Sequence, residues 1–87
     1  MDMIDEELAR LKNRLDDLRN RIIPNLDIKA QQVYAQVMSM PKESEKRLKL
    51  EKEYALMDKE VRMRSDEGIK IAQQMENLEF EKNLGKR

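Results

Sequence analysis

Three arginines in the first quarter of the chain, Arg10, Arg14 and Arg21, are the residues whose type and spacing best suggest binding chemistry. Each carries a planar fork of N–H donors that suits a phosphate or a carboxylate group. They belong to a basic belt around the middle of the molecule, although several nearby acids dilute it. Those acids are Asp16, Asp17, Asp66 and Glu67.

This belt has two interpretations. It could be a surface for nucleic acid or for an acidic partner, or it could be a solvated helical surface with interspersed ion pairs. The chain has 18 basic and 18 acidic residues, so it has no net charge to attract a polyanion. The neutral balance favours the second interpretation, and nucleic-acid binding through Arg10, Arg14 and Arg21 is the alternative.

Catalytic and metal-binding chemistry is not indicated by the composition. The sequence contains no histidine and no cysteine, which removes the commonest metal ligands, the neutral-pH proton carrier and the thiol nucleophile. Its two glycines, Gly68 and Gly85, stand apart, so no glycine-rich loop can hold a phosphate. We expect no catalytic residues, no cofactor and no metal site.

The segment that begins at Ile4, IDEELARLKNRLDDL, resembles the opening of small all-helical chorismate mutases. The resemblance implies a cofactor-free helical enzyme that holds a dianionic substrate with Arg and Lys side chains inside a bundle. In this chain the three arginines fall outside the apolar stripe, and Arg64 is the one charged residue at an interior position. We therefore expect a protein that is not an enzyme.

The helices that would position these residues follow from the spacing of apolar side chains. From Ile4 to Ile22 they recur at steps of three and four, as in the seam of a coiled coil. Beyond Pro24 the pattern resumes one residue out of step. We expect a helix over about residues 3–23, a kink or break at Pro24, and a second helix over about 26–39. A true turn at Pro24 would instead give a three-helix bundle.

A stronger break lies at residues 39–43, where Pro41 stands between two possible capping serines, Ser39 and Ser44. We expect a turn there, because Pro41 suits the start of a new helix, and we expect a long helix over about residues 43–82. An unbroken apolar stripe follows this helix. Its members are Leu50, Tyr54, Met57, Val61, Arg64, Gly68, Ile71, Met75 and Leu78.

Folding the chain at Pro41 aligns the two stripes, so that Leu8 faces Met75 and Leu15 faces Gly68. The midpoint of these pairs coincides with the strongest turn signal. We expect an all-α, coiled-coil-like antiparallel helical hairpin that spans residues 1–87 as a single domain. This architecture is similar to that of plasmid RNA-binding hairpins, which dimerise into four-helix bundles.

One layer of the expected hairpin looks weak. Leu18 faces the polar pair Arg64 and Ser65. Gly68 lies in the middle of a helix, where glycine costs about 1 kcal/mol relative to alanine. It either makes room for Leu15 or marks a local break before a separate last helix.

A second apolar stripe on the long helix lies on a face away from the seam. A lone hairpin would leave this stripe in water, so we expect a protein interface there. Dimerisation would complete a four-helix bundle, and other helical subunits of a complex would bury the stripe equally well. The expected interface residues are Leu48, Leu56, Met63 and Ile69, with Ala55 beside them.

The remaining composition predicts an intracellular protein. The acidic first residues differ from a signal peptide, the absence of cysteine fits a reducing compartment, and no apolar run is long enough to span a membrane. We expect a cytoplasmic or otherwise intracellular, non-catalytic module that self-assembles or joins a multi-subunit complex. The alternative is a hairpin dimer that binds nucleic acid.

Overall fold

A computed structural model describes residues 2–85, and every regular element in this range is helical. Helix α1 covers Met3–Asp17, the π-helical segment η1 covers Leu18–Ile22, α2 covers Ile23–Met38 and α3 covers Glu45–Gly85. The prediction of an all-α chain is confirmed for this part of the sequence.

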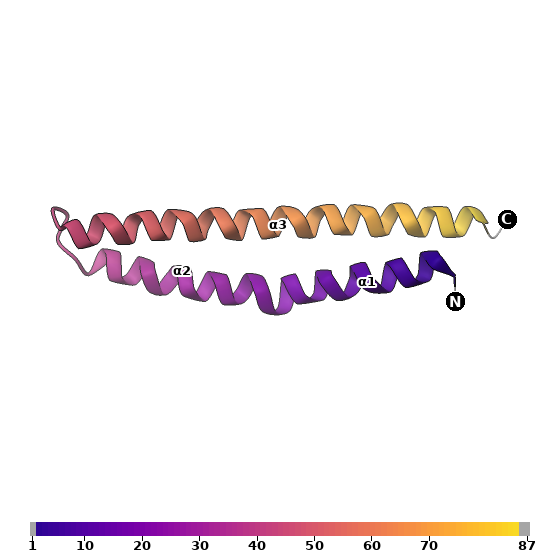
Figure 1. Cartoon of the computed structure of the whole chain (residues 1–87), viewed down its shortest axis with the longest axis horizontal. Helices are drawn as coiled ribbons and strands as arrows, with labels where there is room; N and C mark the ends of the chain where they lie inside the picture. The colour runs from indigo at the N-terminus through magenta and orange to yellow at the C-terminus, as the bar shows by residue number, and fades with distance from the viewer. Residues whose placement is uncertain (1, 86–87) are drawn as a thin grey trace.

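The elements form two long arms that lie side by side and run in opposite directions (Figure 1). The first arm consists of α1, η1 and α2, and the second arm is α3 alone. The described residues span 67 × 16 × 13 Å and form a rod, with the start of α1 and the end of α3 at the same tip. A rod of two arms has a narrow interior and a large surface.

Helix α1 begins where the sequence supplies a cap and negative charge. The Asp2 carboxylate accepts a hydrogen bond from the backbone N–H of Ile4 at 3.3 Å. Asp5 and Glu6 follow in the first turn, where their charge suits the positive end of the helix dipole.

The first arm continues through Pro24, and the interruption lies just before the proline as a π-helical turn. The backbone N–H of Ile23 donates to the carbonyl of Leu18, five residues earlier. Such a turn holds one more residue than an α-helical turn. The extra residue accounts for the one-residue slip between the stripes that end at Ile22 and begin at Leu26.

The π-turn has a second consequence, because Pro24 has no N–H to donate and its ring crowds the preceding turn of an α-helix. Placing Pro24 at the start of α2 avoids both problems. The arm bends at this point and bows away from α3 (Figure 1). Both apolar stripes nevertheless continue to face α3, so the helix is not reversed into a third arm.

The best-packed part of the interior contains Leu15, Leu18 and Ile71, of which Leu18 is fully buried at 0% exposure. The expectation of a weak layer at Leu18 is therefore wrong. Around the π-turn the first arm contributes an additional apolar side chain, Ile23, which the heptad pattern did not include. Several half-buried residues pack against this cluster, namely Leu11, Ile22, Ile23, Ala72 and Met75.

Gly68 lies in this layer opposite Leu15, within an uninterrupted α3. A Cβ atom built on Gly68 would lie 3.6 Å from Leu15 Cδ1, which is an ordinary van der Waals distance. The local break considered at this position is not found. The absence of a Cβ is also not a steric requirement of the packing.

The turn between the arms is held by serine and arginine side chains. The Ser44 hydroxyl accepts the backbone N–H of Arg47 at 3.4 Å and caps α3, which begins at Glu45. Pro41 lies in the turn itself, since α3 begins only at Glu45, and the Pro41 carbonyl accepts a hydrogen bond from the N–H of Ser44. The Arg47 guanidinium donates to the Met40 carbonyl at 2.8 Å and so ties the turn to α3.

Candidate protein-interaction surface

Within the described residues, the most extensive row of exposed apolar side chains lies on α3. We call this row the outer stripe, and its members are Leu48, Leu56, Met63 and Ile69. These residues are 53%, 68%, 57% and 58% exposed, respectively. All four lie on one continuous helix, so their relative positions are fixed by helical geometry. The four residues that the sequence predicts as an interface are therefore all exposed on the surface of the described chain.

The outer stripe faces away from the first arm. When the inner seam of α3 is written as heptad positions a and d, Leu48 and Ile69 fall at position b, and Leu56 and Met63 fall at position c. Positions b and c flank position f, which is directly opposite the a/d seam. No residue of the first arm can reach this face.

The same face extends toward the end of α3 through two more exposed apolar residues. Neither was among the predicted interface residues. Phe80 is 65% exposed and occupies position f, and Leu84 is 48% exposed and occupies position c. The outer-face positions between Ile69 and Phe80 are all polar, so the row of apolar residues is interrupted after Ile69. Heptad positions, applied to the whole of α3, would have found the continuation.

Exposed apolar residues on the first arm do not form a comparable stripe. Tyr34 is partly satisfied within the chain, because its ring centroid lies 5.4 Å from that of Tyr54 at an angle of 48°. Ile28 and Met38 are 56% and 60% exposed and stand on α2 without an apolar row between them. The apolar surface that could bind a partner is concentrated on α3.

Each of the three arginines predicted as a possible nucleic-acid surface contacts a carboxylate. Arg10 lies 3.5 Å from Glu7, and Arg21 lies 3.1 Å from Asp17 within the same arm. Arg14 instead reaches across to α3, where its Nε donates to Glu67 at 2.7 Å. The three side chains thus do not form an open row of unpaired cations.

These contacts shift the titration of their partners. The hydrogen bond from Arg14 lowers the pKa of the Glu67 carboxyl, and Arg64, at 3.1 Å, acts in the same direction. The hydrogen bond from Arg21 likewise lowers the pKa of Asp17. Both carboxylates are therefore held in their charged form, which favours the ion-pair interpretation of the belt.

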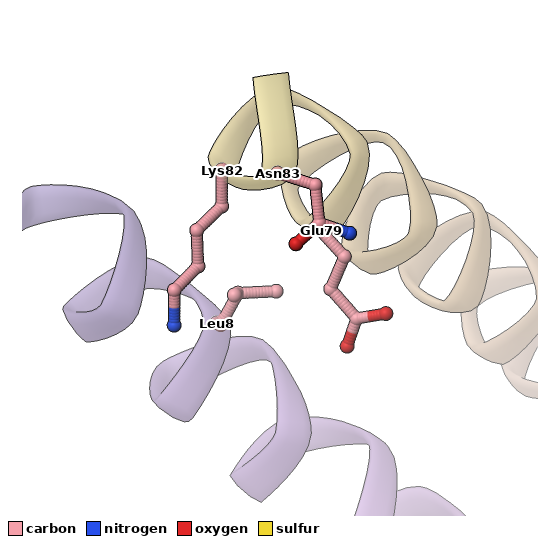
Figure 2. A pocket seen from close by; sticks show the side chains of 4 residues that line it. All are labelled: Leu8, Glu79, Lys82 and Asn83. Carbon is pink, nitrogen blue, oxygen red and sulfur yellow. The ribbon is translucent and has the colours of Figure 1, made fainter. Parts of the chain in front are cut away.

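A shallow groove lies between the arms at the open end of the rod and is lined by Leu8, Glu79, Lys82 and Asn83 (Figure 2). Lys82 extends from α3 toward α1, where its ammonium group pairs with Asp5. This hydrogen bond raises the pKa of Lys82. The lining of the groove thus includes one ammonium group, which is paired with Asp5, and the carboxylate of Glu79.

Other kinds of site are not found in residues 2–85. No group of three or more His, Cys, Asp or Glu side chains in this range could hold a metal ion. In the same residues, no helix is long and apolar enough to cross a membrane. Comparison of the chain with protein-family models, with curated proteins and with solved structures finds no match.

Proposed function

We propose that this protein is a non-catalytic assembly module, an antiparallel helical hairpin that self-associates through the outer stripe of α3. One observation carries the proposal. Four large apolar side chains, each more than half exposed, occupy a single face of one helix on the side opposite its seam. A periodic stripe of this kind is typical of a helix that packs against a second helix.

The small interior of a single chain also favours burial of the outer stripe against a second copy. Within residues 2–85, the buried apolar residues are Leu15, Leu18, Ala30, Val37 and Ile71. So small an interior rarely provides a large excess over the conformational entropy of ordering a chain of this length. Burial of the outer stripe would add about 1–2 kcal/mol for each half-exposed Leu, Ile or Met side chain.

The position of the stripe also determines which helices meet in the proposed assembly. Because the stripe lies opposite the seam, the α3 helices of two copies would pack against each other and the first arms would lie outside them. The four helices would form a layered bundle in which α3 has neighbours on both faces. This arrangement satisfies both apolar faces of α3.

Nucleic-acid binding is less well supported by the contacts. Arg10, Arg14 and Arg21 would each have to exchange a carboxylate partner for a phosphate. If binding existed, it would weaken steeply with salt, whereas assembly through apolar side chains would persist. An intracellular location remains part of the proposal and rests on the absence of cysteine from the sequence.

Substitution of the stripe tests the proposal. In the double variant Met63→Glu/Ile69→Glu, the solution mass measured by light scattering should fall to that of a monomer. The control is Ile28→Glu/Met38→Glu, which adds the same two charges at similarly exposed apolar positions on α2. It should leave the mass unchanged, and an unchanged mass in Met63→Glu/Ile69→Glu would contradict the proposal.

A further inference from the structure

The charges around the outer stripe select one way of docking a second copy. We infer that two α3 helices pack antiparallel through their outer faces, with the two-fold axis between Arg62 and Met63. This inference rests on the proposed self-association and adds the orientation and the register. It is carried by the pattern of apolar and charged residues at positions b, c and f of α3.

The apolar contacts fit this register. Leu56, at position c, lies opposite Ile69 of the partner subunit, and the symmetry repeats this layer on the other side of the axis. Met63 lies beside the axis, where the two copies of its side chain meet. Leu56, Met63 and Ile69 are the most exposed members of the stripe. The central part of the interface would therefore bury the side chains with the largest exposed fractions.

The charged contacts are complementary in the same register. Lys59 and Asp66 both occupy position f, at the centre of the outer face, and Lys59 lies opposite Asp66 of the partner subunit. Lys49 similarly lies opposite Glu76 of the partner subunit. All four side chains are exposed, and none forms an ion pair with another of the described residues.

Neighbouring registers bring like charges together at the axis, in the centre of the outer face. A shift of one heptad in one direction brings Lys59 against its own symmetry copy, and a shift in the other direction does the same for Asp66. A parallel pair in register places every charge of the outer face opposite an identical charge. Like charges held face to face disfavour an interface, so the antiparallel register is the one that the sequence selects.

Arg62 is the one cation that lies close to its own symmetry copy in this arrangement. Its guanidinium is already paired with Asp58 of the same helix at 3.2 Å. The two copies would therefore bring together two cations and two anions, with no net charge at the axis. Its aliphatic stem can also cover part of Met63.

Disulfide cross-linking tests the register directly, because the chain contains no cysteine of its own. In the single variant Met63→Cys, the two sulfurs lie beside the axis and should form a cross-linked dimer under mild oxidation. In Leu48→Cys the two sulfurs lie roughly 40 Å apart along the helices, so this variant should remain uncross-linked. Cross-linking of both variants would indicate a parallel pair, and cross-linking of neither would exclude this axis.

A charge exchange provides an independent test of the Lys59–Asp66 contact. Lys59→Glu and Asp66→Lys should each weaken dimerisation about tenfold, since each places like charges opposite each other twice. The double variant Lys59→Glu/Asp66→Lys should restore the affinity of the unmodified chain. Failure of the double variant to do so would contradict the register.

The two proposals fail in different ways. If the unmodified chain is a monomer at every concentration, both the self-association and its register are wrong. If the chain is a dimer but Leu48→Cys cross-links as well as Met63→Cys, the self-association stands and the antiparallel register is wrong.

Discussion

The inner and the outer face of α3 carry similar apolar side chains at similar spacing but differ in what covers them. On the inner face, Ile71 is 7% exposed because the first arm lies against it. On the outer face, Ile69 is 58% exposed, only two residues away along the chain. The difference shows that periodicity identifies an apolar face of a helix and does not say whether the same chain covers it.

The largest expected effect comes from breaking the inner face. Leu18→Ala truncates a fully buried side chain and leaves a cavity, which should lower the free energy of unfolding by about 2–5 kcal/mol. Chemical denaturation followed by circular dichroism measures this change. Ile28→Ala, at an exposed position, should change stability by less than about 0.5 kcal/mol. Equal effects of the two variants would contradict the packing described.

The next effect concerns how the first arm keeps the inner face covered. Deletion of Asn20 removes the extra residue of the π-turn and forces Pro24 into an unbroken α-helix, at a cost of about 3 kcal/mol. Combining the deletion with Pro24→Ala should recover most of the loss, because Ile23 would take the seam position of Ile22. Thermal unfolding of both variants measures the recovery. If the combined variant does not recover stability, the π-turn has a role other than compensating for the one-residue slip in the apolar pattern.

A smaller effect of opposite sign is expected at Gly68. Gly68→Ala should raise the free energy of unfolding by about 0.5–1 kcal/mol, because the new methyl group fits at 3.6 Å from Leu15 and the unfolded chain loses freedom. Gly85→Ala, at the end of α3 with open space around it, is the control and should change stability less. Destabilisation by Gly68→Ala would indicate that the layer is tighter than described.

The smallest effect is expected from Arg14–Glu67, one of the ion pairs that link the arms. Because Arg14 lowers the pKa of Glu67, this pair stabilises the folded state above the ordinary carboxyl pKa of 4.5, and the contribution is lost as the pH falls through the lowered value. Glu67→Gln should therefore reduce the melting temperature slightly at pH 7 and have no further effect in strong acid. Glu53→Gln, at an exposed residue of the same helix, is the control and should leave the melting temperature at pH 7 unchanged.

Much of the fold could be predicted from apolar spacing, because a narrow stripe at three- and four-residue steps has few solutions other than paired helices. The slip beyond Ile22 was visible in the sequence and was attributed to Pro24. Its structural form, a π-turn that begins at Leu18, could not be predicted, because a kink and an inserted residue give the same slip. The burial of Leu18 was missed for the same reason.

The candidate surface was predicted only in part. Exposure of Leu48, Leu56, Met63 and Ile69 follows from their position opposite the seam, whereas their role as an interface remains a prediction. The pairing of Arg14 with Glu67 could not be predicted, because a cross-arm contact depends on the rotation of each helix and on side-chain rotamers. Heptad position alone does not specify either of these.

The most direct test of the account is the solution mass of the unmodified protein, measured by light scattering over a wide concentration series. If two copies associate through the outer stripe, the 10.4 kDa chain should form a dimer that dissociates only on strong dilution and that persists at high salt. A monomer at all concentrations would contradict the central claim, since the outer face of α3 would then not be covered by a second copy.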